Sequence, residues 1–230
     1  MKKFLIVIFY LFLFNNTSNA LVEVDITRGN LDPLPIAVSP LYLEPDSKDI
    51  SIDGKIIKNA GEEISKIIEV NFKRSGLFNP LKKESFVQKP DIAHIKPRFE
   101  DWKLIKAQAL VTGKVKITED KIRVEFRLWD VVAAKEMVAL AFSTTPANWR
   151  RVAHMISDKI YQRLTGEEGY FDSRIIYVSE TGPKTQRYKK LAIMDQDGAN
   201  VKYLTLGNEL VLTPRFSPKN QLVTYLSYFR

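Results

Sequence analysis

Cysteine is absent from this chain of 230 residues. Disulfide bonds, thiolate catalysis and thioether-linked lipid anchors all require a cysteine sulfur, so this sequence excludes each of them. Without covalent cross-links, the fold has to be stabilised by the burial of apolar side chains. Hydrophobic residues make up 45% of the sequence, which is enough for a core of ordinary size.

Histidine is scarce, and neither imidazole has neighbours in sequence that suit metal binding. His94 and His154 are the two histidines of the chain. Neither has a second His, a Cys or an H-E-x-x-H motif beside it, so we predict no metal site. We expect His94 to lie in a loop and His154 to lie on the surface or edge of a helix.

The motifs that mark catalytic sites are missing as well. There is no G-x-S-x-G nucleophile elbow and no glycine-rich phosphate loop, and Ser217 has no general base near it in sequence. Adjacent carboxylates such as Glu62 and Glu63 point in different directions on a helix, and we expect them to be solvated charges. We therefore predict that the protein is not an enzyme, has no catalytic residues and needs no cofactor.

Positive charge is not concentrated anywhere in the sequence. The formal net charge is +8, yet no run of five like charges occurs. Nucleic-acid sites gather lysine and arginine in one patch, whereas a dispersed excess is typical of a solvated surface. We predict no nucleic-acid partner.

The first twenty residues have the pattern of a secretory signal peptide. Lys2 and Lys3 form a positive start, residues 4–14 are an apolar run, and Ser18-Asn19-Ala20 supplies small residues before a cut. We predict cleavage between Ala20 and Leu21. The run is shorter than the roughly 20 apolar residues of a membrane span, and no second run of that length follows. The sequence thus predicts export to the periplasm and a soluble mature chain without a membrane span.

Residues 21–34 form a short arm after the predicted cleavage site. Val22, Val24 and Ile26 alternate with polar residues, which is typical of a half-exposed strand. Two interpretations stay open. The strand docks on its own domain, or it adds to the sheet edge of a partner protein, where main-chain hydrogen bonds give affinity. Both can hold at different times.

Residues 35–168 are predicted to fold as an α/β domain, a mixed sheet covered by helices. Residues 36–43 have strand composition, and apolar residues from Ile57 to Phe72 recur at helical spacing until Gly76, where a C-terminal cap ends the helix. The clearest hairpin joins residues 107–117 to residues 122–128 across a polar turn.

Two more elements complete this domain. Residues 137–142 are apolar on both faces, which predicts a third strand in a more buried position. Apolar residues from Trp149 to Leu164 form a helical stripe that begins after Pro146 and ends before Gly166.

Residues 169–230 are predicted to be all-β. Short apolar runs separated by turn residues occur at 174–179, 191–194, 202–206 and 222–228. Asp195 and Asp197 have the spacing that begins a calcium loop, but the later oxygen ligands and the bidentate glutamate are missing, so a hairpin turn is favoured. The first and last runs are separated by an interval typical of a propeller blade.

Several segments of the sequence carry a family resemblance. Asp195-Gln196-Asp197-Gly198 precedes Pro214-Arg215-Phe216-Ser217-Pro218-Lys219-Asn220 and Leu222-Val223-Thr224-Tyr225. This order resembles the TolB-type propeller repeat, D-x-D-G, then P-x-[FW]-S-P-[DN]-G, then I-A-[FY]. Lys219-Asn220 departs from the usual Asp-Gly, but Asn tolerates positive φ, so the turn is kept. Pro35-Ile36-Ala37-Val38 and Asp101-Trp102 with Ala109-Leu110-Val111-Thr112-Gly113 resemble the N-terminal part of the same family.

The resemblance to the TolB family implies a non-enzymatic periplasmic protein of the Tol-Pal system. In that family the N-terminal arm engages the inner-membrane protein TolA, and the propeller binds the peptidoglycan-associated lipoprotein Pal. These contacts support outer-membrane invagination during cell division and outer-membrane integrity. Carried onto this chain, the resemblance assigns partner binding to the arm residues Leu21, Val22, Val24, Asp25, Ile26, Thr27 and Gly29.

A single blade is a four-stranded sheet that cannot bury both faces, and propellers need about 4 to 8 blades. Residues 169–230 hold little more than one blade, so we expect a truncated propeller that is unstable after Gly169 and binds Pal weakly or not at all. The alternative is a periplasmic accessory part of a serine hydrolase whose catalytic domain is absent, because related propellers cap some serine peptidases.

Overall fold

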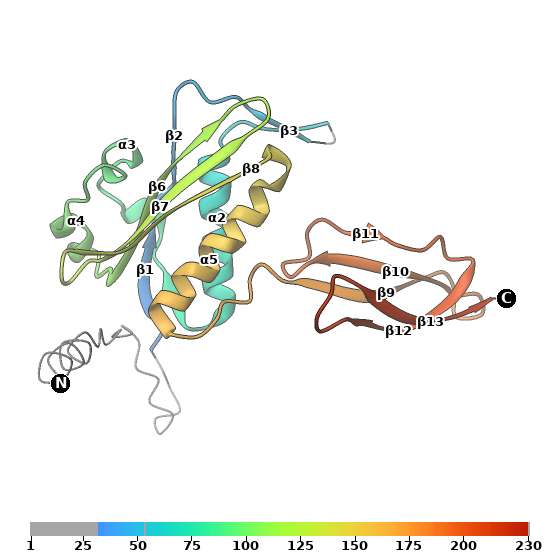
Figure 1. The fold of residues 1–230 in the computed structure, drawn as a ribbon. Coiled ribbons are helices and arrows are strands. Elements are labelled where there is room, and N and C mark those ends of the chain that lie inside the picture. The colour runs from blue at the N-terminus through green and yellow to red at the C-terminus, as the bar shows by residue number, and fades with distance from the viewer. Residues whose placement is uncertain (1–31, 53, 230) are drawn as a thin grey trace, which may run out of the picture.

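The computed structural model of this protein describes residues 32–52 and 54–229 (Figure 1). The predicted signal peptide, the cleavage site at Ala20 and Leu21, and the predicted binding residues of the arm therefore lie outside the described residues. Within the described residues, an α/β region is followed by a strand-rich region. No helix among them is long and apolar enough to cross a membrane.

A six-stranded mixed sheet forms the centre of the α/β region. Its strands are β1 (Leu34–Val38), β2 (Tyr42–Leu43), β5 (Phe78–Pro80), β6 (Ala109–Ile117), β7 (Ile122–Asp130) and β8 (Lys135–Thr144). The order is β5-β1-β6-β7-β8, and β2 pairs with β6 beyond the end of β1. β1 runs parallel to β5 and β6, whereas β6, β7 and β8 form an antiparallel meander. The predicted hairpin, now β6 and β7, is confirmed.

Two long helices cover one face of this sheet (Figure 1). They are α2 (Ala60–Ser75) and α5 (Trp149–Thr165). Asn59 caps α2 because its side chain accepts a hydrogen bond from the Glu62 N–H at 3.2 Å. Gly76 and Gly166 end the two helices in the left-handed conformation, with φ of 74° and 81°. The apolar faces of both helices and the facing side of the sheet form the main core.

A smaller core lies on the opposite face of the sheet, beside α3 (Pro90–Ala93) and α4 (Phe99–Leu104). Trp102 is 1% exposed there, and its indole N–H donates to Gln88 Oε1 at 3.1 Å. No helical stripe reveals these helices in the sequence, because with four and six residues they are too short to have one. Single-turn 3-10 helices occur at Lys83–Ser85 and Pro146–Asn148.

The predicted strand at residues 36–43 is wrong in its middle. β1 ends at Val38, and Pro40 lacks the N–H that a strand ladder needs. The chain instead approaches α2, where the Leu41 N–H donates to Ser65 Oγ at 3.0 Å, before β2 rejoins the sheet.

The predicted helix begins later than its apolar stripe. Ile57 belongs to β4 (Lys55–Ile57), which pairs with β3 (Ile50–Ile52) in a separate hairpin. The helix cannot extend back to Ile57 because the Asn59 cap fixes its start.

The predicted burial of the third strand is also wrong. β8 lies at the end of the sheet, where β7 is its one partner among the described residues. Val138 and Phe142 pack against the main core, whereas Leu140 is 43% exposed. The apolar residues of this strand therefore do not indicate burial on both faces, because one face packs on the core and the other is exposed.

Beyond Gly166 the chain is rich in strands. They are β9 (Arg174–Thr181), β10 (Tyr188–Asp195), β11 (Lys202–Tyr203), β12 (Glu209–Phe216) and β13 (Val223–Phe229). β9, β10 and β11 form an antiparallel sheet, and β12 and β13 form a hairpin next to β9 and β10 (Figure 1). Each predicted run overlaps a strand. β12 was not among them, because Pro214 interrupts its pattern and a register shift between Leu212 and Arg215 accommodates it.

Candidate functional site

The predicted arm enters the fold directly at the central sheet. Asp32 and Pro33, the first described residues, are both exposed. The next residue, Leu34, begins β1 and its N–H donates to the Leu77 carbonyl at 2.9 Å. The segment that precedes Asp32 is therefore joined to the fold at the surface, next to an inner strand of the sheet.

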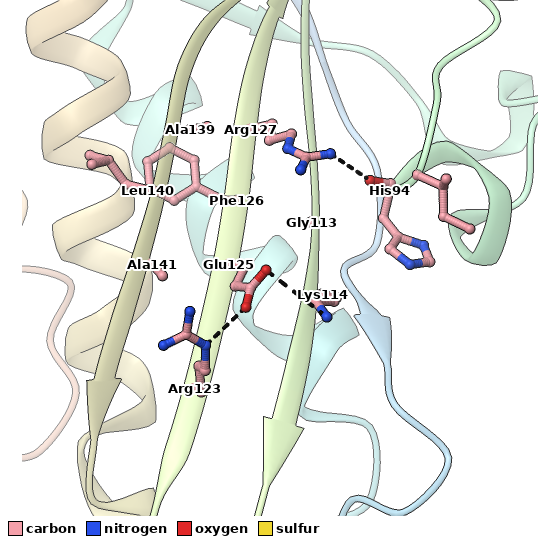
Figure 2. A pocket seen from close by; sticks show the side chains of 11 residues that line it. His94, Gly113, Lys114, Arg123, Glu125, Phe126, Arg127, Ala139, Leu140 and Ala141 are labelled. Atoms are coloured by element: carbon pink, nitrogen blue, oxygen red, sulfur yellow. Dashed lines mark hydrogen bonds and ion pairs between the residues drawn. The ribbon is translucent and has the colours of Figure 1, made fainter.

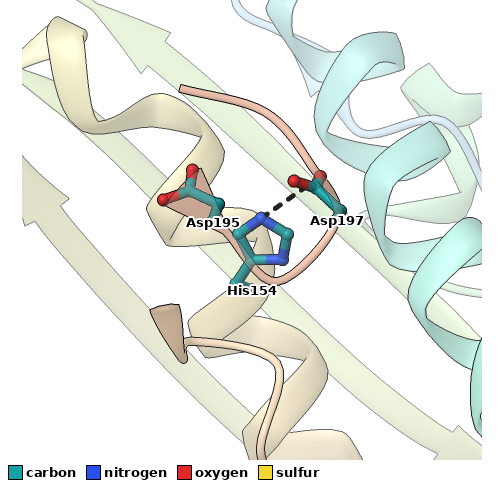
Figure 3. A group of neighbouring side chains, drawn as sticks. All are labelled: His154, Asp195 and Asp197. Atoms are coloured by element: carbon teal, nitrogen blue, oxygen red, sulfur yellow. Dashed lines mark ion pairs between the residues drawn. The ribbon is translucent and has the colours of Figure 1, made fainter. Parts of the chain in front are cut away.

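The structure brings together a second group of polar residues that the sequence analysis did not join. The turn between β10 and β11 packs onto α2 and α5, and Figure 3 shows Asp195 and Asp197 of this turn on either side of the His154 ring, with an ion pair drawn to Asp197. We call the following residues the junction cluster: Asn71 and Arg74 of α2, Arg150, His154 and Ser157 of α5, and Gln196 and Asp197 of the turn.

Gln196 is the centre of the contact with α2. Its side-chain amide donates to Asn71 Oδ1 at 3.0 Å, and its carbonyl accepts from Arg74 Nη2 at 2.9 Å. Its own N–H donates to the Ser173 carbonyl at 3.1 Å, in the segment that leads into β9. One residue of the blade is thereby bonded to helix α2 through its side chain and its main chain.

His154 is buried, and the prediction of a surface or edge position is wrong. Its exposed fraction is 2%. The cause is non-local, because α2 and the turn after β10 cover the side of α5 on which His154 lies. This packing joins residues far apart in the sequence, so helical periodicity alone could not reveal it.

The orientation of the Asn71 amide assigns the proton of His154 to one of its two ring nitrogens. The Ser157 hydroxyl donates to the Ala153 carbonyl at 2.9 Å, so its oxygen has to accept from Asn71 Nδ2, which lies 2.9 Å away. The same Nδ2 group lies 3.0 Å from His154 Nδ1. Since Asn71 Nδ2 is a donor, Nδ1 is the acceptor and the neutral ring carries its proton on Nε2.

Asp197 lies between the guanidinium of Arg150 and the imidazole of His154. It forms an ion pair with Arg150 Nη2, and its Oδ2 lies 3.6 Å from His154 Nε2. Burial lowers the pKa of His154, because a charged ring loses its hydration there, while the nearby Asp197 carboxylate opposes this shift. The imidazole is therefore held in its neutral form at neutral pH.

The composition of the cluster is also that of a metal site, since ligand atoms of His154, Asp195 and Asp197 lie within 4.8 Å of one another. The network opposes that use. Nε2 carries a proton, and the Arg150 guanidinium already neutralises Asp197. The prediction that no metal binds stays a prediction, now with this physical reason.

The turn at Asp195 is confirmed as a hairpin turn. Asp195 N–H donates to the Ala199 carbonyl at 2.9 Å, and Gly198 adopts a φ of 86°.

Polar residues on otherwise apolar helix faces are the one sequence signal of the junction cluster. Asn71 is next to Phe72 on the buried side of α2, and Ser157 is beside Ile156 on that of α5.

A groove of about 590 Å³ crosses the face of β6, β7 and β8 that is turned away from α5 (Figure 2). Its cations have carboxylate partners. Lys114 Nζ lies 2.9 Å from Glu44, and Arg123 Nε lies 2.9 Å from Glu125. The hydrogen bond from Lys114 lowers the pKa of the Glu44 carboxyl. These charges satisfy each other, whereas Gly113, Ala139, Leu140 and Ala141 give the groove an apolar lining between them.

His94 lies at the edge of this groove, in the turn after α3, as predicted. Its ring stacks on Tyr42, with 4.6 Å between the ring centroids. No second histidine or acidic cluster joins it in the described residues to form a metal-ligand group.

Comparison with known proteins gives matches along most of the chain. The family model of the TolB amino-terminal domain matches residues 22–137, and that of the TolB beta propeller domain matches residues 161–230. The Tol-Pal system protein TolB of Pelagibacter ubique (strain HTCC1062) is 71% identical over 213 residues, which are 92% of this chain and 47% of the relative. The chain thus spans about half the length of this relative.

A solved structure matches the fold. The crystal structure of TolB from Acinetobacter baumannii superposes with a TM-score of 0.69 and 26% sequence identity, over 86% of this chain and 44% of that chain. The predicted fold class is confirmed. It is a mixed α/β domain followed by the start of a β-propeller.

Proposed function

This chain belongs to the TolB family, and on that premise we propose that it is a periplasmic protein-binding component of the Tol-Pal system. The family is not a family of enzymes, so the alternative of a hydrolase accessory part is dropped. In this proposal the arm engages a TolA-like inner-membrane protein, and a complete propeller, of which residues 169–230 supply little more than one blade, contacts a Pal-type lipoprotein. The two contacts support outer-membrane invagination during division and outer-membrane integrity.

The observation that carries the proposal is where the family match begins. The match to the TolB amino-terminal domain starts at residue 22, inside the predicted arm, so the alternating residues Val22, Val24 and Ile26 belong to the segment shared with the family. The exposed residues Asp32 and Pro33 support the proposal, because they lead from the arm to β1 at the surface. A strand joined there has an open route to the sheet edge of a partner.

The test measures binding of the chain to the C-terminal domain of TolA from the same organism by titration calorimetry. Val24→Asp and Ile26→Asp place a charge on the apolar face of the proposed added strand. We expect each to weaken binding at least tenfold, which corresponds to about 1.4 kcal/mol. Glu23→Gln, on the opposite face, is the matched control and should bind as the unmodified chain does.

The same variants separate the two interpretations of the arm. If the arm docks on its own domain at rest, Val24→Asp also lowers the melting temperature of the chain without TolA. Unchanged affinity for TolA in both aspartate variants would contradict the proposed binding site.

A further inference from the structure

We propose that the outer surface of residues 81–107 docks on a bilayer that contains anionic phospholipids. These residues carry α3 and α4 over the sheet face opposite α2 and α5, and we call them the cap (Figure 1). The inference goes beyond the protein partners proposed above and does not depend on them.

The cap leaves large apolar side chains in water although it has a core of its own. Trp102 is buried in the smaller core, whereas Val87, Ile92 and Ile95 are 66%, 52% and 68% exposed. By contrast, the long helices α2 and α5 together leave one large apolar side chain exposed, that of Val70. Exposed apolar side chains that gather on one element indicate a surface that binds another body.

Hydrogen bonds keep these three residues of the cap close together. The Ile95 N–H donates to the Ile92 carbonyl at 3.1 Å, so these two residues lie one turn apart. The buried side chain of Gln88 donates to the Lys96 carbonyl at 3.0 Å, which places Val87 beside the end of the same turn. We call Val87, Ile92 and Ile95 the apolar tip of the cap.

Lysines without a carboxylate partner flank the apolar tip. Lys89 and Lys96 are exposed, and neither forms an ion pair with another described residue. Arg98, in contrast, pairs with Asp101 at 2.7 Å. The carboxylate of Asp91, also exposed, partly offsets the two lysines.

Positive charge also prevails over the whole cap. It holds seven lysines and arginines against four aspartates and glutamates. Glu84 and Asp91 are its exposed carboxylates that form no ion pair in the described part of the chain. Its exposed cations without an ion pair there are Lys82, Lys89, Lys96 and Lys106. Unpaired cations beside exposed apolar side chains are typical of surfaces that lie in the interface of an anionic membrane.

The types of residue favour a lipid surface over a protein surface. The cations of the cap without an ion pair are lysines and its apolar tip is aliphatic, whereas protein interfaces are enriched in arginine and aromatic residues and depleted in lysine. A lysine stem is long and flexible, so its ammonium can reach a layer of phosphates while its carbons stay on apolar surface.

A second exposed apolar group lies at the end of α4. Leu104 is 79% exposed and is followed by Lys106. The turn after β7 adjoins this place, because the Val131 N–H donates to the Gln108 carbonyl at 2.9 Å, and its Val132 is exposed as well. The cap therefore presents two apolar groups, each beside a lysine without an ion pair.

The first experiment locates the surface that meets the lipid. Because the chain lacks cysteine, one introduced cysteine carries a nitrobenzoxadiazole label at a chosen place. The label is attached in turn to Val87→Cys in the cap, Val70→Cys on α2 and Leu206→Cys in the blade, three positions that are exposed in the folded chain. The probe is a vesicle of phosphatidylglycerol and phosphatidylcholine in equal parts at low salt.

We expect brighter, blue-shifted emission from the label on Val87→Cys and no change from the other two. Vesicles of phosphatidylcholine alone should change none of them. No response in Val87→Cys, or a larger response in Val70→Cys or Leu206→Cys, would overturn the proposal. It is also overturned if the vesicles leave Val87→Cys unchanged and the TolA domain shifts its emission, because the cap is then a protein-binding surface.

The second experiment tests the charges by co-sedimentation of the chain with the same vesicles. Lys89→Gln combined with Lys96→Gln should weaken binding about 25-fold, since each lysine near an anionic surface contributes about fivefold. Lys73→Gln combined with Lys159→Gln removes the same charge from exposed positions of α2 and α5 and should have little effect. Asp91→Asn should strengthen binding. Equal losses in the two lysine pairs would show adsorption by net charge alone and would refute docking through the cap.

The third experiment tests the apolar tip. Ile92→Ser combined with Ile95→Ser should weaken binding at least tenfold, because both side chains leave water when the cap docks. Ile56→Ser is the control, at a 63% exposed position of β4. Circular dichroism checks that each variant keeps the fold. Unchanged binding in the double serine variant would contradict insertion of the tip.

Discussion

The α/β domain and the blade region differ in how much of their apolar surface they cover themselves. The domain encloses two cores, with Phe72, Trp102 and Phe126 among its fully buried side chains. In the described part of the blade, the buried apolar residues are Leu191, Ala192 and Val211. Large apolar side chains stay exposed there, among them Leu206 at 83%, Leu222 at 61% and Tyr228 at 56%.

This difference predicts that one region folds as a complete unit and that the other is a layer that needs neighbours. Burial of apolar surface is the main favourable term in folding, and a two-layer domain supplies it internally. A blade presents two faces and needs an adjacent layer on each. The junction cluster provides one polar contact between the regions, but it does not cover the apolar faces of the blade.

The largest expected effect is the difference in stability between the two regions when each is produced as a separate fragment. Phe171 is 1% exposed and packs in the main core, so a cut after Asp172 leaves the domain intact. We expect residues 32–172 to unfold cooperatively on heating and residues 173–230 to be digested rapidly by protease and to show no cooperative transition. Circular dichroism and limited proteolysis measure both. A protease-resistant blade fragment would contradict the comparison.

The next effect tests the core of the domain against the surface of the blade. Phe72→Ala removes a fully buried ring that packs against Phe78 and Phe171, and it should lower the free energy of unfolding by about 3–5 kcal/mol. Leu206→Ala, at an 83% exposed side chain, should change it by less than about 0.5 kcal/mol. Urea denaturation of the domain transition gives both values. Equal losses of the free energy of unfolding in the two variants would show that the blade shares the core of the domain.

The smallest effect concerns the polar contact between the regions. Asp197→Asn keeps the shape of the side chain but removes its ion pair with Arg150, whose side chain is 24% exposed. We expect docking of the blade to weaken by about 1 kcal/mol at low salt and by less at high salt. Asp172→Asn is the control, because its partner Arg151 is 58% exposed. Pulsed electron resonance between spin labels on Lys66→Cys and Lys184→Cys, two exposed positions in a chain without cysteine, reports the docked fraction of both variants. A larger loss in Asp172→Asn would contradict this ranking.

Much of the fold could be predicted because its signals are local. The stripe of α5 and the alternation of β6 and β7 stand in the sequence at periods of 3.6 and 2, and glycine marks both helix ends. The exposed edge position of β8 could not be predicted, because a short run that is apolar on both faces has the same sequence pattern in a central strand and in an edge strand. Strand order is a property of long-range pairing, which periodicity does not encode.

The same contrast between local and long-range signals applies to the two candidate sites, the arm and the junction cluster. The arm was predicted from alternation and from the family resemblance, and its binding role stays a proposal. The junction cluster was missed, because His154 is buried by a turn that follows it by about forty residues. Its polar neighbours Asn71 and Ser157 lie on the buried, otherwise apolar faces of their helices. A polar residue at such a position in the sequence was the detectable sign of a hydrogen-bonded contact inside the fold.

The position of β1 also determines how the fold responds to mechanical load. A partner that pulls on the arm applies its force to β1 along the strand axis. β1 is bonded in parallel to β5 on one side and to β6 on the other. The ladder bonds lie across the direction of pull, so they share the load in shear and do not open one after another. The sheet can therefore serve as an anchor for a tether under tension, because two ladders share the load on β1, whereas β8 has one ladder, to β7, among the described strands.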